Sequence, residues 1–165
     1  MEKENYYKHC VSLLNERGVS IDDIVQCSIY LQAKYKNNLS EEYYFDAVNS
    51  VLNKREVQFA IMTGIVLDKL AEAQAIPDKY LQECLVNDEP LYGTDEVLAY
   101  SICNLYGSIA LTNFGYIDRK KYGIIKRLNN DKHQCNTFLD DIIGAIAAAA
   151  ASNIAHNKSV LSKKD

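Results

Sequence analysis

Three groups of acidic residues in the second half of the chain could bind a divalent cation. They are Asp95 with Glu96, Asp118, and Asp140 with Asp141. Carboxylate oxygens are ligands that Mg²⁺ prefers, and a partly hydrated Mg²⁺ can also bind the phosphate of a substrate. If the three groups converge in the fold, they would form a site suited to phosphoryl chemistry. Whether they converge depends on the elements that carry them.

Two of these groups also stand where a helix is predicted to begin. The first pair lies in the first turn of a helix predicted to be capped by Thr94. The second pair, Asp140 and Asp141, follows Thr137 with the spacing of a loose capping box. Carboxylates in a first turn are favoured by about 0.3–1 kcal/mol, and adjacent helix residues point about 100° apart. Helix capping and metal binding therefore both stay open.

A basic segment surrounds the middle acidic residue. Six Lys and Arg residues and two Asp residues fall within 118–133, which gives this window a net charge of +4 in a chain of −4. Arg119 and Lys121 follow Asp118 within three positions and could bind the oxygens of a phosphate group. An ordinary solvent-exposed helix face would have the same composition, so both interpretations stay open.

The elements that must position these residues are predicted to be helices. The chain has 165 residues with only 2 prolines and 7 glycines, and a sheet protein would need more tight turns. Ser20 and Ser40 each precede acidic residues and a helical spacing of apolar residues, which is typical of N-caps. The predicted helices cover residues 5–18, 20–31, 40–52, 55–74, 78–86, 94–113, 116–128 and 137–157.

We expect one all-α globular domain of about seven or eight helices around a buried central helix. The predicted divisions are 1–157 for the domain, with N-terminal helices in 1–53 and a core in 54–157, and 158–165 for a flexible tail. The central helix is either 55–74, which is apolar around much of its circumference, or the Ala-rich helix 137–157. Small residues at 147–151 would allow close helix packing inside the fold or across a two-fold dimer.

Several classes of protein are disfavoured. No segment reaches the roughly 20 apolar residues of a spanning helix, and the nearest, 142–155, is interrupted by Ser152 and Asn153. Five scattered cysteines indicate reduced thiols in the cytoplasm, and the N-terminus shows no leader pattern. The net charge of −4 argues against a nucleic-acid partner. Segment 15–32 loosely resembles a helix-turn-helix, but its second helix has little positive charge, which disfavours DNA binding.

Three segments resemble the motifs of one family in their order along the chain. They are TDEVLA at 94–99, IDRKK at 117–121 and TFLDDIIGAIAA at 137–148. An Asp-Glu pair, a middle Asp with a following Lys, and an Asp-Asp pair before an Ala/Gly-rich continuation also occur in phosphatidylglycerophosphatase A. The resemblance covers residues 50–157. The whole chain is similar to the soluble branch of that family, known as YutG-like or low-temperature-requirement-C-like.

The resemblance implies an Mg²⁺-dependent phosphatase that removes the terminal phosphate of phosphatidylglycerophosphate in phospholipid metabolism. It implies that the metal ligands are Asp95, Glu96, Asp118, Asp140 and Asp141, and that the catalytic residues are Asp95, Asp118, Asp140 and Asp141. Lys121 matches the family's lysine and, with Arg119, would bind the phosphate. The expected partner is a phosphate-containing substrate, either a lipid or a soluble molecule.

The chain departs from the membrane-bound members of the family at several points. A Gly-Thr-x-Gly-Ser segment is absent, Gly115 replaces an Arg, Tyr122 replaces a Pro, and the spanning helices are missing. Two alternatives therefore stay open: a soluble phosphatase acting on another phosphoester, and a non-catalytic regulatory or stress-response protein. We expect a cytoplasmic location, either free or peripheral to the membrane. The twelve tyrosines and the Ala-rich helix leave a homodimer or higher homo-oligomer open.

Overall fold

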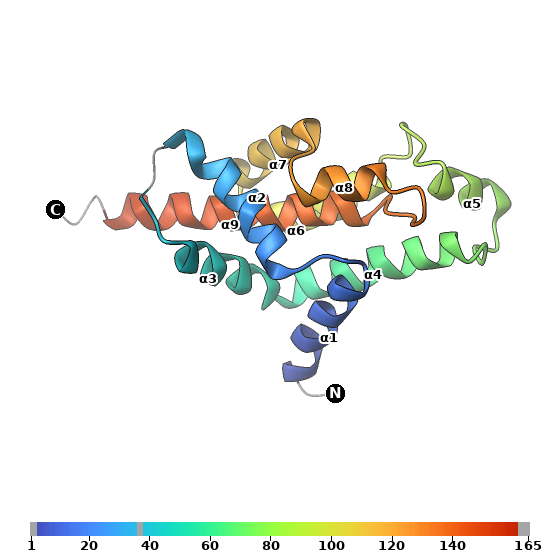
Figure 1. Ribbon diagram of the computed structural model, residues 1–165, viewed down its shortest axis with the longest axis horizontal. Helices are drawn as coiled ribbons and strands as arrows, with labels where there is room; N and C mark the ends of the chain where they lie inside the picture. The colour runs from blue at the N-terminus through green and yellow to red at the C-terminus, as the bar shows by residue number, and fades with distance from the viewer. Residues whose placement is uncertain (1–2, 36–37, 162–165) are drawn as a thin grey trace.

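The computed structural model describes residues 3–35 and 38–161, and helices make up every regular element in that part of the chain (Figure 1). The elements are α1 Lys3–Glu16, α2 Ile21–Gln32, η1 Ala33–Tyr35, α3 Glu41–Leu52, α4 Arg55–Glu72, α5 Lys79–Val86, α6 Thr94–Cys103, α7 Ser108–Lys120, α8 Ile124–Asn130 and α9 Leu139–Leu161. Of these, η1 is a single 3-10 turn. The prediction of one all-α domain is confirmed for the described residues.

The Ala-rich helix α9 is the centre of the fold. It runs along the long axis of the molecule, and α2, α3, α4, α6, α7 and α8 pack against it (Figure 1). Residues 145–151 are completely buried, because small alanine side chains let helices approach α9 from several sides. The sequence left two candidates for the central helix, and the structure selects α9. Among the described residues, no helix is long and apolar enough to cross a membrane.

The N-terminal helices share this core. From α2, the Ser28 hydroxyl donates to the carbonyl of Ala147 at 2.9 Å, and the Gln32 amide donates to that of Ala151 at 3.2 Å. Buried polar groups need such partners, and here they join α2 to α9. At its other end α9 continues to Leu161, beyond the predicted end at 157, while residues 162–165 of the predicted tail lie outside the described residues.

Two of the four predicted helix caps are confirmed. Ser20 forms a full capping box, in which its hydroxyl accepts from the Asp23 N–H at 3.1 Å and its own N–H donates to the Asp23 carboxylate at 2.8 Å. Ser40 accepts from the N–H of Tyr43. The cap at Thr94 is wrong, because Gly93 holds the N-cap position of α6 and makes no side-chain cap.

The helix predicted over 94–113 is interrupted. α6 ends at Cys103 and α7 begins at Ser108, because Gly107 has φ +86° and ψ −166°, a combination that L-residues with a Cβ rarely adopt. The helix predicted over 116–128, shorter or bent at Gly123, is wrong in where it begins, whereas the break at Gly123 is confirmed. Its first half belongs to α7, and its second half forms α8 after Gly123. As a result Asp118 lies near the C-terminal end of α7.

Gly64 allows α4 to approach the beginning of α9 closely. A Cβ at this position would overlap the side chain of Ile142 and lie 3.0 Å from the Cβ of Phe138. This contact brings α4 next to the segment that carries the second acidic pair. It also explains why a glycine stands on the buried face of a long helix, where it would otherwise only weaken the helix.

Candidate functional site

The acidic residues of the three motifs line one cleft. Asp95 and Glu96 lie in the first turn of α6, Asp118 in the last turn of α7, and Asp140 and Asp141 in the first turn of α9. They come together because α6 and α7 both pack against α9. We call this site, of about 250 Å³, the acidic cleft. Its lining residues are Asp88, Glu89, Pro90, Gly93, Asp95, Glu96, Asp118, Lys121, Asp140 and Asp141.

The acidic cleft carries a large excess of negative charge. Seven of its ten lining residues are acidic and one, Lys121, is basic. Burial is the main cause that raises the pKa of Asp95, Asp140 and Asp141, and repulsion from neighbouring carboxylates adds to it. Buried carboxylates that repel one another favour the binding of a cation, because its charge would offset both the desolvation and the repulsion.

Lys121 joins two of the helices that form the cleft. It follows the last residue of α7 in the left-handed conformation, with φ +48° and ψ +58°. Its ammonium group donates to Asp118 at 2.6 Å and to Asp140 at 2.9 Å. Burial alone would lower the pKa of Lys121, but the attraction of Asp140 and Asp118 is larger and raises it above its usual value. Lys121 is therefore a fixed positive charge inside the cleft.

The donor chemistry of the cleft suits a hard divalent cation. Oxygen ligands are abundant, and no ion pair among the described residues engages Asp95, Glu96 or Asp141. The side chains are not gathered around a single point, however: within the described residues, no three His, Cys, Asp or Glu side chains form a ready metal-binding group. The carboxylates stand around the cleft, and a bound cation would have to draw several of them inward.

Asp68, which the motifs do not include, positions the start of α9. It comes from α4 and is completely buried, and its carboxylate accepts from the N–H groups of Phe138 and Leu139, each at 3.0 Å. Burial raises its pKa to about 8, against the opposing effect of these two donors. The capping box predicted at Thr137 is wrong, since that hydroxyl donates to the carbonyl of Leu85 at 2.6 Å.

The sequence pattern could have identified some of the remaining site residues but not others. Asp68 could have been found, because it falls on the apolar face of α4 with Ile61 and Ile65, where a carboxylate needs partners. Asp88 had no such pattern, since it lies in an irregular segment between α5 and α6. Arg119, which was predicted to bind phosphate, is exposed on α7 and is not among the lining residues.

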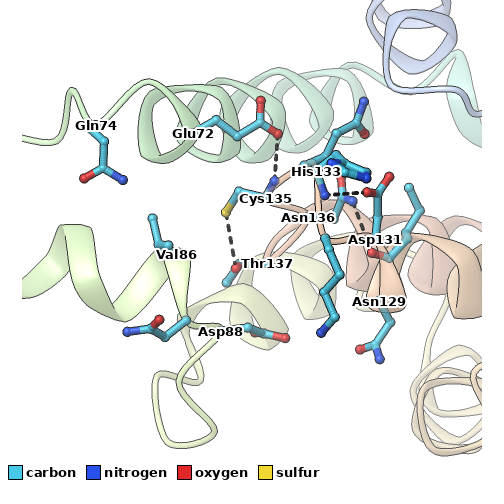
Figure 2. A pocket seen from close by; sticks show the side chains of 14 residues that line it. Glu72, Gln74, Val86, Asp88, Asn129, Asp131, His133, Cys135, Asn136 and Thr137 are labelled. Carbon is cyan, nitrogen blue, oxygen red and sulfur yellow. Dashed lines mark hydrogen bonds between the residues drawn. The ribbon is translucent and has the colours of Figure 1, made fainter.

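A second pocket, shown in Figure 2, shares the lining residue Asp88 with the acidic cleft. It has a volume of about 360 Å³ and lies between the end of α4, the end of α5 and the segment 129–137. We call it the amide pocket, because five amide side chains are among its lining residues: Gln74, Asn87, Asn129, Gln134 and Asn136.

A buried arginine holds one wall of the amide pocket. Arg17 donates to both carboxylate oxygens of Glu72, to the carbonyl of Cys135 at 2.6 Å and to the side-chain oxygen of Asn136 at 3.1 Å. Glu72 in turn accepts from the N–H of Cys135 at 2.7 Å, as Figure 2 shows. These bonds fix the segment that leads directly into α9, so the shape of the pocket and the position of the cleft depend on one network.

The fold and the site together define an all-helical protein with a carboxylate-rich cleft at the meeting point of three helices. The motifs at the acidic cleft belong to a known family: residues 17–156 match phosphatidylglycerophosphatase A. The match covers most of the chain, and the protein belongs to this family. The resemblance seen in the three motifs is thereby confirmed.

Several relatives are similar to this chain over most of its length in sequence or in structure. YutG, an uncharacterized protein of Bacillus subtilis, is 55% identical over 144 residues, which are 87% of this chain and 86% of YutG. The crystal structure of YpjQ from Bacillus subtilis has a TM-score of 0.93 at 48% identity and covers 98% of this chain and 99% of its own. That of the low temperature requirement C protein from Listeria monocytogenes has a TM-score of 0.92 at 49% identity and covers 96% and 99%. The predicted branch of the family is thus confirmed.

Proposed function

We propose that the protein is an Mg²⁺-dependent phosphatase of phosphate monoesters, with phosphatidylglycerophosphate as the first substrate to test. The observation that carries this proposal is the convergence of all three acidic motifs on one cleft that contains a single lysine. Membership of the phosphatidylglycerophosphatase A family supports the same reaction class. Capping alone would account for each acidic pair separately, but it would not require them to share a cleft.

The residues of the cleft divide into two groups by their contacts. Asp95, Glu96 and Asp141 have no ion-pair partner among the described residues and would hold Mg²⁺. When bound, Mg²⁺ supplies charge neutralisation of the phosphate and orientation of an attacking water. Asp118 and Asp140 keep Lys121 in place. An ammonium group has three donors, so a third proton of Lys121 remains for a non-bridging phosphate oxygen.

Exposed apolar residues beside the cleft support a lipid substrate. Leu91 is 93% exposed and lies two positions after Glu89, a lining residue. Val97 is 63% exposed and directly follows Glu96. Large apolar side chains at such exposure are available for contact with a lipid surface. A lipid substrate would place the protein at the membrane surface while it acts, whereas a soluble phosphoester would not require this location.

The proposal is tested by measuring Mg²⁺-dependent phosphate release. The substrates are phosphatidylglycerophosphate in mixed micelles and a panel of soluble phosphate monoesters. We expect release by the wild type, and a fall of about 100-fold or more when Asp95→Asn and Asp140→Asn are combined. Asp46→Asn, which changes an exposed carboxylate on α3, should leave the rate unchanged. No release by the wild type from any substrate would favour the non-catalytic regulatory alternative.

A further inference from the structure

The amide pocket and the acidic cleft share a wall. Asp88, which follows α5, lines both of them. At the start of α9, Thr137 lines the amide pocket and Asp140, three residues later, lines the acidic cleft. The two pockets therefore adjoin at Asp88, and the amide pocket lies next to a phosphate bound in the acidic cleft.

Several polar side chains of the amide pocket are available to a ligand. Within the described residues, the side-chain amides of Gln74, Asn129 and Gln134 have no hydrogen-bond partner. Each amide offers an oxygen that accepts and an NH₂ group that donates. Asn136 differs, because its amide is already used by Arg17 and by the carbonyl of Leu128. Gln74, after α4, and Asn129, at the end of α8, lie on opposite sides of the pocket in Figure 2.

The charge of the amide pocket limits what it can bind. Its charged lining residues are Glu72, Asp88, Asp131 and Lys132. The excess of carboxylates would repel a second phosphate, and the apolar lining from Val86 and Leu128 is too small for an acyl chain. Hydroxyl groups suit this lining, because they can donate to the carboxylates. They can also donate to the oxygen of an amide and accept from its NH₂ group. The lining thus fits a neutral group that carries several hydroxyls.

We propose that the amide pocket binds the hydroxyl-bearing alcohol part of the phosphate monoester whose phosphate occupies the acidic cleft. This inference rests on the proposed phosphatase function and defines the substrate class. A volume of about 360 Å³ accommodates an alcohol of the size of glycerol or a hexitol. A soluble polyol phosphate and the glycerol of a lipid headgroup share this chemistry, although the second phosphate of such a lipid would have to lie outside the pocket. The experiment below separates these two sources.

The test compares substrates that differ only in the alcohol part. Sorbitol 6-phosphate and glycerol 3-phosphate carry hydroxyls, n-hexyl phosphate carries none, and phosphatidylglycerophosphate in mixed micelles supplies the lipid headgroup. The variant Asn129→Ala/Gln134→Ala removes two open amides outside the acidic cleft. The matched control is Asn157→Ala, an exposed amide toward the opposite end of α9. Each protein is assayed for kcat/KM with Mg²⁺ after its helical content is confirmed by circular dichroism.

We expect the wild type to prefer at least one hydroxyl-bearing substrate over n-hexyl phosphate by about tenfold or more, the effect of one or two hydrogen bonds. The double variant should lose this preference and keep its rate on n-hexyl phosphate, while Asn157→Ala should match the wild type. Preference for the soluble phosphates identifies a soluble substrate, and preference for the micellar lipid alone identifies a headgroup. No preference in the wild type, or an unchanged preference in the double variant, would overturn the proposal.

A failure of the proposed function is distinguishable from a failure of this inference. If the wild type releases no phosphate from any substrate, the phosphatase proposal fails. The pocket is then tested by calorimetric titration of sorbitol 6-phosphate and of the micellar lipid. Binding that is weakened about tenfold in the double variant but not in Asn157→Ala supports the pocket. Absence of binding to the wild type overturns it.

Discussion

Lys121 holds an unusual position for a lysine, since its backbone is left-handed and its ammonium group is shared by two carboxylates on different helices. Left-handed conformations of residues other than glycine are uncommon and concentrate at functional sites. Here the conformation ends α7 and brings a positive charge into an otherwise negative cleft. The residue therefore has a structural task, which is to join α7 to α9, and a proposed chemical task, which is to bind phosphate.

Replacement of Lys121 should distinguish a specific role in phosphate binding from the mere loss of one positive charge. Lys121→Met keeps the length of the side chain but removes the donor, and we expect phosphate release to fall by about 10²–10³-fold, as for the loss of other charge-stabilising donors. Lys120→Met is the control, because Lys120 is exposed and outside the cleft. Equal rates for the two variants would show that Lys121 takes no part in phosphate binding.

Asp68 is a second residue whose role follows from its contacts. In Asp68→Asn the side-chain NH₂ group cannot accept, so the N–H of Phe138 or of Leu139 loses its partner. We expect the free energy of unfolding to fall by about 1–2 kcal/mol, the usual effect of losing a helix cap or leaving a buried donor unpaired. Urea denaturation measures it, with Asp46→Asn as an exposed control. A change no larger than that of the control would mean that α9 begins correctly without this carboxylate.

At the scale of elements, the site depends on where α6 and α7 end. The apolar residues from 94 to 113 have a helical spacing that predicts one helix, but Gly107 interrupts it. The break lets α6 and α7 pack against α9 as separate helices, each of which contributes acidic residues to the cleft. A continuous helix would hold Asp95 and Asp118 about 35 Å apart, at 1.5 Å per residue, so the break is a condition for the site.

Two alanine substitutions in this region should have opposite effects. A Cβ added at Gly107 or at Gly115 would have no atom within 4 Å, so steric contacts of the new side chain would be the same at the two positions. Gly107→Ala forces a Cβ into a left-handed backbone and should destabilise the protein by about 1–3 kcal/mol. Gly115→Ala lies within α7 and should stabilise it by about 0.5–1 kcal/mol. Melting temperatures that move in the same direction would contradict this account.

At the scale of the whole molecule, the excess of cleft carboxylates links stability to pH and to cations. The raised pKa of Asp95, Asp140 and Asp141 means that the folded protein holds protons which the unfolded chain has already released above about pH 4. Unfolding in this range releases protons, so the stability of the metal-free protein falls as the pH rises through the raised pKa values. A bound cation would replace those protons and reverse the loss.

Mg²⁺ should therefore raise the melting temperature more at about pH 7.5 than at about pH 5, because protons compete with the cation for the carboxylates more strongly at the lower pH. Differential scanning calorimetry with and without Mg²⁺ at the two pH values measures the difference. In the combined variant Asp95→Asn/Asp141→Asn the effect of Mg²⁺ should shrink at both pH values. An Mg²⁺ effect that is equal at the two pH values, or absent, would contradict cation binding by these carboxylates.

Features that depend on neighbouring residues could be predicted from the amino-acid sequence. The helical class, the caps at Ser20 and Ser40, the burial of the Ala-rich helix and the three acidic motifs could all be predicted, because a cap or an amphipathic face is encoded within a few positions. The same local reasoning placed caps wrongly at Thr94 and Thr137. The N-cap of α6 is Gly93, and the first N–H groups of α9 donate to the distant Asp68 instead.

Which of these local features meet in space depends on how the helices pack, and no local pattern predicts it. The cap of α9 by Asp68, the bridge from Lys121 to Asp140, and the wall that Asp88 supplies to both pockets join residues far apart in the chain. Such contacts depend on how whole helices pack, and packing reflects the summed burial of many side chains rather than any local pattern. The motifs name the acidic residues, whereas the packing of α6 and α7 on α9 brings them into one cleft.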